Sequence, residues 1–291
     1  MGPLTLPTLV GALVPLAGEG HTYQTPGVRD FRYFCQAREA GELGPNDPGN
    51  VAGCTFGVDW LNKPFWQAVI GAALVIVLWW LAARKLSLVP GRGQFFWEYV
   101  YSFVRNGIAR DILGPEYRRY LPYLLGLFSF LLVNNWFGEF FLFMLPTFSN
   151  IGYAWILAIM SFVIYIGAGI RTHGVGGYLR RSLIPEGVPV YLWPIIIPLE
   201  FLSNFITRPL TLALRLFANM FAGHLVVMVF VVGGAFLLTY PGNAFYNISG
   251  AVSILFSFAI LFLELFIGLL QAYIFTVLTA QYIHSSVAES H

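Results

Sequence analysis

The chain has 291 residues, of which 57% are hydrophobic and 10% are charged, and its mean hydropathy is +0.70. Soluble domains carry roughly 25% charged residues, so this composition excludes an ordinary soluble protein and indicates an integral membrane protein. The formal net charge of +2 gives no indication of nucleic-acid binding. Lipid requires backbone polar groups to be paired internally, and alternating segments of about 10 residues are absent, so we predict an all-α fold.

Residues 1–63 form a predicted external N-terminal segment that is rich in glycine, proline and acidic residues. This segment holds four basic and six acidic residues, whereas seven basic residues lie between Arg84 and Arg119. Arg171, Arg180 and Arg181 form a second basic cluster, and the positive-inside rule places both clusters in the cytoplasm and the N-terminus outside. The two cysteines, Cys35 and Cys54, either form a disulfide in an oxidising exterior or remain two unpaired thiols.

Residues 64–291 form the predicted membrane domain, which starts with shorter elements. In chain order we expect a spanning helix at 65–83, an interfacial amphipathic helix at 95–113, spans at 120–146 and 151–170, and a cytoplasmic loop at 171–189. The second and third spans would make a membrane hairpin.

Two long apolar stretches follow, at about 191–238 and 244–283. A 48-residue helix would be about 72 Å long, whereas the hydrocarbon core is about 30 Å thick. Each stretch is therefore either two spans or one tilted, bent helix. Neither contains a convincing polar turn, although a glycine pair at 233–234 is a weak point, so we favour two long helices joined by residues 239–245.

The segment "LALRLFANMFAGH", from Leu212 to His224, places Arg215 within one of these stretches. Insertion scales assign about 3 kcal/mol to an arginine at mid-membrane depth, so Arg215 needs a partner or water. At 100° per residue, Ala218, Asn219 and Ala222 share its face, and such small residues allow another helix to come close. We predict that Arg215 forms a transient ion pair with a carboxylate that approaches it and then leaves. The structural alternatives are a static ion pair with Glu264 and snorkelling to the interface.

Other polar residues also lie in apolar surroundings. His224 lies about 180° around the helix from Arg215, so the two should have different neighbours. A polar stripe in the last stretch would line water or a polar partner; it contains Ser253, Ser257, Glu264, Gly268 and Gln271. Structural hydrogen bonding remains an alternative for His224 and Glu264. For Asn134, Asn135 and Glu139, packing is as good an explanation as function.

Two segments, "RPLTLALRLFANMFAGH" and "LELFIGLLQAYIFTVLTAQYI", closely resemble the a subunit of F-type ATP synthases, and the match extends from about residue 60 to the end. The resemblance implies that Arg215 is the family's essential arginine and that Asn219 and Gln271 are its polar neighbours. Many members have glutamate and histidine where this chain has His224 and Glu264, so the pair is exchanged, a pattern also found in the family.

"LVNNWFGEFF" resembles the segment that forms the family's proton inlet, which implies that Asn134, Asn135 and Glu139 line a half-channel. Glu139 falls one place from the position that is acidic in some members, and Glu200 lies near another acidic family position. Together with Ser253 and Ser257, these residues are the candidates for channel lining. We expect no cofactor and no metal ligands.

The resemblance implies an architecture in which two long tilted helices pack against a ring of c subunits. It implies a bacterial plasma-membrane protein, similar to actinobacterial members, whose partners are the c ring, b-type peripheral stalk subunits, lipid and translocated protons. "GVGGYLRR" lacks the ending of a phosphate-binding loop, so a non-catalytic proton-channel subunit is expected. The alternatives are a secondary transporter that binds an anionic substrate through Arg215, for which no internal repeat is present, and a membrane scaffold, which leaves the polar stripe unexplained.

Overall fold

The computed structural model describes Pro26, Ser87 and residues 63–84, 91–139, 147–184, 189–239 and 244–288. Cys35, Cys54 and nearly all of the predicted external segment lie outside these residues, so the disulfide and the role of that segment stay predictions. All regular elements in the described ranges are helical. Five helices there are long and apolar enough to cross a membrane, as a multi-pass membrane protein requires.

The first expected span corresponds to α2, Lys63–Arg84. The expected interfacial helix is built from three successive pieces: α3 (Arg92–Val104), the π-helix η3 (Arg105–Arg110) and α4 (Asp111–Leu113). Exposed aromatic rings cover α3, at Phe95, Phe96, Tyr99 and Phe103. Such a surface suits the membrane interface.

A sharp turn separates α4 from the next membrane helix. Gly114 has a φ of 58°, which glycine adopts without the steric cost that a side chain would bring. The short 3-10 helix η4 (Gly114–Glu116) then leads into α5, Tyr117–Glu139. The expected second span at 120–146 therefore begins as predicted, and its described helix ends at Glu139.

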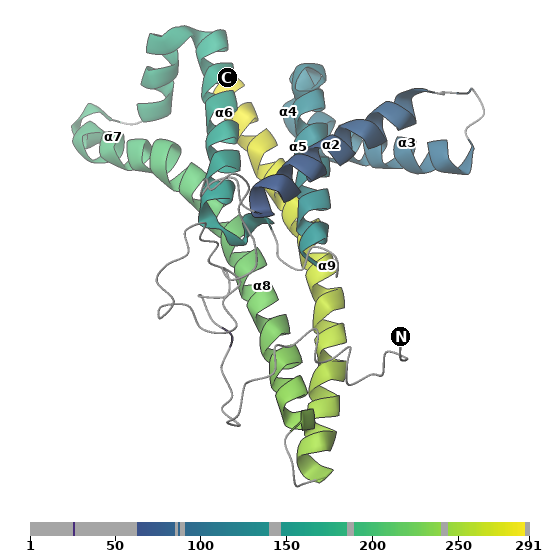
Figure 1. Ribbon diagram of the computed structural model, residues 1–291. Coiled ribbons are helices and arrows are strands. Elements are labelled where there is room, and N and C mark those ends of the chain that lie inside the picture. Colours follow the sequence, from purple (N-terminus) through teal and green to yellow (C-terminus); the bar gives the residue numbers. More distant parts are fainter. Residues whose placement is uncertain are drawn as a thin grey trace.

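The 3-10 helix η5 (Thr147–Ser149) precedes α6, Ile151–Leu183. A helix covers the span predicted at 151–170, but the loop predicted for 171–189 is wrong in its first part, because a second helical piece follows a kink at Gly174 and extends to Leu183. Gly174, with a φ of 70° and a ψ of 168°, is not helical and forms the kink between these two helical pieces. After this bend the chain folds back, and Tyr178 packs against Gly169 (Figure 1).

The two long apolar stretches form two long helical arms, as favoured from their lengths. The first contains the 3-10 helix η6 (Val190–Leu192), α7 (Trp193–Phe201), the π-helix η7 (Leu202–Thr207) and α8 (Arg208–Thr239). It bends where α7 meets α8 (Figure 1), beside Pro209, which lacks a backbone N–H. The second is the single helix α9, Ala244–Val287.

The glycine pair predicted as a weak point does not interrupt α8. A Cβ atom added at Gly234 would lie 3.1 Å from the carbonyl oxygen of Gly250, so these glycines bring α8 and α9 into close contact. Small residues at a crossing allow two membrane helices to approach along their backbones. Gly234 therefore supports helix packing.

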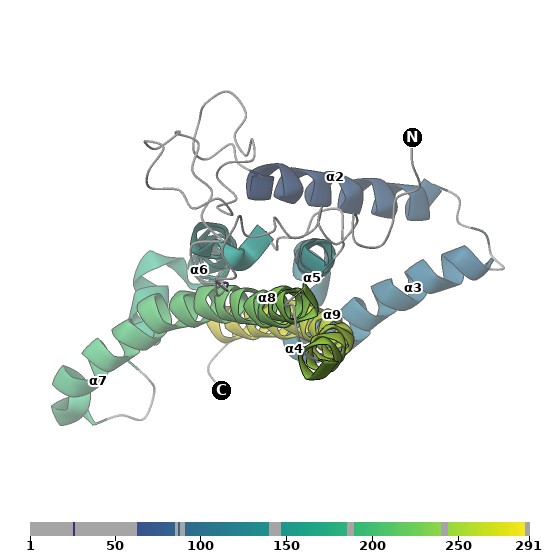
Figure 2. The ribbon, with the colours of Figure 1, turned by 60° about the horizontal axis from the view of Figure 1, so that its bottom comes forward.

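The helices are arranged in layers, as Figure 2 shows: α2 lies on one side, α5 and α6 lie in the middle, and α8 and α9 lie on the other. Fully buried side chains join the middle layer to the α8–α9 pair, among them Leu124, Leu131, Phe148, Leu212 and Phe275. The outer side of α8 and α9 carries exposed apolar residues such as Val226, Phe262 and Phe266. Arg215 lies on this outer side.

Candidate functional site

Arg215 is exposed on the outer side of α8, and the face predicted to surround it is exposed as well. Ala218, Asn219 and Ala222 are exposed, and Val226 has an exposed fraction of 40%. Arg215 makes no ion pair with any residue in the described part of the chain. The guanidinium group therefore lies beside small side chains, where the backbone of another helix could come close.

Asn219 and Gln271 form a hydrogen bond between α8 and α9, one turn from Arg215. The Nδ2 atom of Asn219 donates to Oε1 of Gln271 over 2.8 Å. Gln271 is 1% exposed, and its Nε2 atom has no hydrogen-bond partner among the described residues. The pair therefore fixes the carboxamide of Gln271 while its N–H groups stay available for water or an incoming group.

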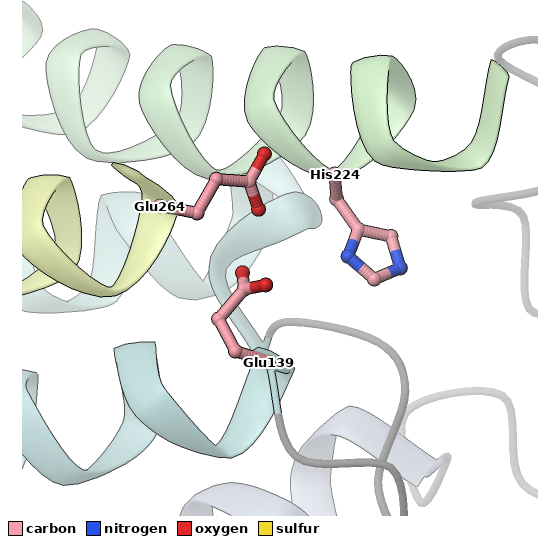
Figure 3. Close-up of side chains that lie close together, drawn as sticks. All are labelled: Glu139, His224 and Glu264. Atoms are coloured by element: carbon pink, nitrogen blue, oxygen red, sulfur yellow. The ribbon is translucent and has the colours of Figure 1, made fainter. Parts of the chain in front are cut away.

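A second polar cluster joins three helices: Glu139 at the end of α5, His224 on α8 and Glu264 on α9 (Figure 3). One nitrogen or oxygen atom from each side chain lies within 4.8 Å of the other two. His224 and Glu264 are 7% and 6% exposed, and Glu139 is partly buried. His224 thus lies on the buried face of α8 while Arg215 lies on the exposed face, as their angular separation predicted.

The chemistry of this cluster suits proton transfer. An imidazole and two carboxyl groups with nitrogen and oxygen atoms within 4.8 Å of one another can pass a proton between helices. The same nitrogen and oxygen donors could also hold a divalent cation, because His and carboxylate groups are common metal ligands. We expected no metal ligands from the sequence, whereas the geometry is compatible with a cation at this point.

Gly223 makes room for Glu264, because a Cβ atom at residue 223 would lie 2.5 Å from Oε1 of Glu264. Gly223→Ala should therefore displace this carboxyl group from its position between α8 and α9, and we expect any proton transfer through the cluster, measured in membrane vesicles, to fall about tenfold. Gly126→Ala is the matched control, since nothing lies within 4 Å of an added Cβ atom there. Equal proton transfer by the two variants would contradict the importance of the close approach between Gly223 and Glu264.

The two asparagines of α5 are both buried, and they make different contacts. The Nδ2 atom of Asn135 donates to the carbonyl oxygen of Gly268 over 2.9 Å, which ties α5 to α9. Nδ2 of Asn134 donates to the carbonyl oxygen of Phe130 over 2.9 Å, and Oδ1 of Asn134 accepts from the Thr147 hydroxyl over 3.3 Å. The Asn135 bond thus packs α5 against α9, whereas Oδ1 of Asn135 has no partner among the described residues.

The remaining candidates make hydrogen bonds away from the cluster. The Ser253 hydroxyl donates to the carbonyl oxygen of Phe230 on α8 over 2.9 Å, and that of Ser257 donates to Ile254 within α9 over 2.7 Å. On α7, Glu200 accepts from Nδ2 of Asn204 over 3.0 Å. The same Asn204 nitrogen also donates to the carbonyl oxygen of Ser182 near the end of α6.

Sequence reasoning did not identify Gln67, Thr147 and Gly223. Gln67 on α2 is 2% exposed, and Thr147 in η5 is fully buried beside Asn134. A single carboxamide inside the apolar run "FWQAVIGAALV" was the available signal for Gln67. No local signal indicated that Thr147 would contact Asn134.

Comparison with known proteins identifies the family. The family described as "ATP synthase A chain" matches residues 65–284. A protein named "ATP synthase subunit a" from a Nocardioides species is 42% identical over 280 residues, which cover 96% of this chain and 99% of the relative. The chain belongs to the ATP synthase subunit a family.

Other members of the ATP synthase subunit a family confirm the match. The subunit a of Pseudarthrobacter chlorophenolicus is 43% identical over 237 residues, covering 79% of this chain and 86% of the relative. That of Myxococcus xanthus is 38% identical over 286 residues, covering 96% of this chain and 89% of the relative. The resemblance found in the two C-terminal segments thus extends over most of the chain, and the relatives named here are mostly actinobacterial.

Proposed function

We propose that this subunit a is the non-catalytic stator of the Fo motor, which controls the protonation of carboxyl groups on a rotating c ring. The exposure of Arg215 on a small-residue face of α8 carries this proposal. The apolar outer side of α8 and α9 would contact the c ring, and b-type peripheral stalk subunits would hold the chain still. Its place would be the bacterial plasma membrane, with residues 1–63 outside and the basic clusters in the cytoplasm.

Proton entry would proceed from the outer side through the cluster of Glu139, His224 and Glu264. Three titratable groups from three helices, with donor and acceptor atoms within 4.8 Å of one another, support such a relay. Asn134, Asn135, Ser253 and Ser257 would flank this half-channel. A proton that leaves the cluster would neutralise a c-subunit carboxylate, which could then rotate into lipid.

Proton release would use a second half-channel on the cytoplasmic side of Arg215. Glu200 supports this assignment because its partner Asn204 also contacts the carbonyl oxygen of Ser182, near the basic end of α6. A carboxyl group at this position could accept the proton that leaves the c ring. The two half-channels would then lie on opposite sides of a single cation.

Arg215 would separate the half-channels because a guanidinium group stays protonated throughout and does not relay protons. An ionised c-subunit carboxylate would be attracted to it, and two unit charges 4 Å apart interact by about 4 kcal/mol at an effective dielectric constant of 20. The Asn219–Gln271 hydrogen bond would hold a carboxamide beside this ion pair. The electrical driving force would be about 2.3 kcal/mol per proton per 100 mV.

The position of the c ring can be tested by disulfide cross-linking in a chain whose Cys35 and Cys54 have been replaced with serine. Ala222→Cys should form a disulfide with a cysteine placed next to the c-subunit carboxyl group, because Ala222 lies on the exposed face of Arg215. Ile76→Cys is the control, since Ile76 is 69% exposed but lies on α2, on the other side of the layers (Figure 2). Cross-linking at Ile76 alone would contradict the proposed interface.

A further inference from the structure

Gln67 on α2 is a buried polar side chain that the proposed pathway does not use. It is 2% exposed, and neither its Nε2 nor its Oε1 atom has a hydrogen-bond partner in the described part of the chain. Between Lys63 and Arg84 it is the only residue with a carboxamide or hydroxyl group. A buried carboxamide without protein partners is favourable only when water satisfies its donors and acceptor.

Contacts between α2 and α5 show where Gln67 lies. A Cβ atom at Gly71 would lie 2.5 Å from Nδ2 of Asn134, and farther along α2 the indole nitrogen of Trp79 donates to the Ser129 hydroxyl over 3.0 Å. Residue numbers rise along α2 from 71 to 79 while those of the contacted residues on α5 fall from 134 to 129, so the two helices run antiparallel. Gln67 is on the Gly71 face one turn earlier, which places it toward the Glu139 end of α5.

The short helix η5 brings another polar group to the same junction. Thr147 donates its hydroxyl to Oδ1 of Asn134 over 3.3 Å, and both residues are 0% exposed. Because η5 packs against both α2 and α5, Thr147 lies where these helices meet. Gln67, Asn134 and Thr147 are therefore three buried polar residues at the junction of α2, α5 and η5.

Unpartnered buried polar atoms continue from this junction toward the cluster. Oδ1 of Asn135 and Oε1 of Glu264 have no hydrogen-bond partner among the described residues. Glu139 follows Asn135 by one turn on α5, so the two share a face. Buried groups of this kind require water, and here they extend from α2 across α5 to α9.

We propose that Gln67, Asn134 and Thr147 line a branch of the outer water path that runs on the α2 side and supplies protons to Glu139. This inference rests on the proposed function. The carboxamide of Gln67 does not carry the proton, because it does not titrate; it holds water by donating and accepting hydrogen bonds. The proton moves between hydrogen-bonded waters and ends on the Glu139 carboxylate, while no covalent bond to carbon changes.

Passive proton flux through Fo measures this branch directly, in vesicles that contain the assembled complex and have then lost the catalytic F1 part. Gln67→Leu replaces the carboxamide with an apolar side chain of similar size and should lower the flux about tenfold, because the water path loses a group that solvates it. Gln67→Asn should keep roughly half of the flux or more, since it retains the carboxamide. The control is Val69→Leu, a change at a position that is 40% exposed on another face of α2.

Thiol labelling tests the presence of water at this position. In a complex whose Cys35 and Cys54 are serine, Gln67→Cys should react with a membrane-impermeant methanethiosulfonate applied from the outer side, and the reaction should block the flux. Val69→Cys should not react, because lipid would cover it. Immunoblots of subunit a and the c ring establish that every variant assembles to the same level.

An unchanged passive proton flux in Gln67→Leu, or an unreactive cysteine at residue 67, would refute the proposed water path on the α2 side. The outcome for Arg215→Ala separates this failure from failure of the proposed function. If Arg215→Ala stops ATP synthesis while Gln67→Leu has no effect, only the branch is refuted. If neither variant changes proton transport, the proposed function fails as well.

Discussion

Arg215→Ala is expected to abolish proton-driven ATP synthesis in membrane vesicles that contain the assembled complex. The variant removes an attraction of about 4 kcal/mol between the guanidinium group and an ionised carboxylate, which corresponds to a loss of about a thousandfold. It also removes the fixed charge that separates the half-channels, so protons should leak through Fo without rotation. Synthesis of ATP and passive proton flux, measured on the same vesicles, report these two effects separately.

Arg208→Ala is the matched control for this experiment. Arg208 also lies on α8, but it contacts its own chain, with its guanidinium carbon 5.0 Å from the centre of the Tyr282 ring and its NH1 atom 3.2 Å from the Ser285 hydroxyl. Its removal should leave coupling intact in complexes that assemble. Arg215→Lys should remain strongly impaired, because a lysine covered by the c ring can lose its proton and then relay protons. Normal ATP synthesis in Arg215→Ala would refute the assigned role.

Glu264→Gln is expected to produce the second largest loss, a decrease of about a hundredfold in ATP-driven proton pumping. Glutamine keeps the shape of the side chain and its hydrogen-bonding capacity but has no titratable proton, so the relay through the cluster is interrupted. Quenching of a pH-sensitive dye in inverted vesicles, measured from pH 6 to pH 9, would detect the loss. Unchanged pumping over that range would remove Glu264 from the proton path.

The geometry of the cluster provides an internal control. Glu264 and His224 lie on neighbouring helices with their ligand atoms within 4.8 Å, so the two groups can exchange positions without leaving the cluster. We expect His224→Glu combined with Glu264→His to pump better than either single change. Ser257→Ala should have little effect, because the Ser257 hydroxyl donates within its own helix to Ile254. These comparisons separate proton relay from packing.

Much of the fold could be predicted from the lengths of the apolar stretches. Residues 244–283 lack a polar turn, and they lie in one helix, α9, because nothing in that stretch stabilises a reversal. The stretch at 171–183 was predicted as a loop because glycines and basic residues are typical of loops. It is helical because Gly174 absorbs the bend and Arg180 and Arg181 lie at the C-terminal end, where the helix dipole favours cations.

The candidate site was only partly predictable. The separation of Arg215 from His224 follows from 100° per residue within one helix, so the sequence alone was enough. The meeting of Glu139 with His224 and Glu264 depends on how three distant helices pack, which single-helix periodicity does not determine. Gln67 could not be predicted as a site residue, because one carboxamide hardly changes the hydropathy of α2. Its burial without a hydrogen-bond partner among the described residues is nevertheless unusual.

A density map of the assembled, membrane-embedded complex would test the central claim most directly, through the surroundings of the Arg215 side chain. We expect the guanidinium group to face the c ring, with a c-subunit carboxyl group within about 6 Å, the range over which opposite charges stabilise one another. A guanidinium group that points into lipid, or that pairs with a carboxylate of its own subunit far from the c ring, would contradict the account.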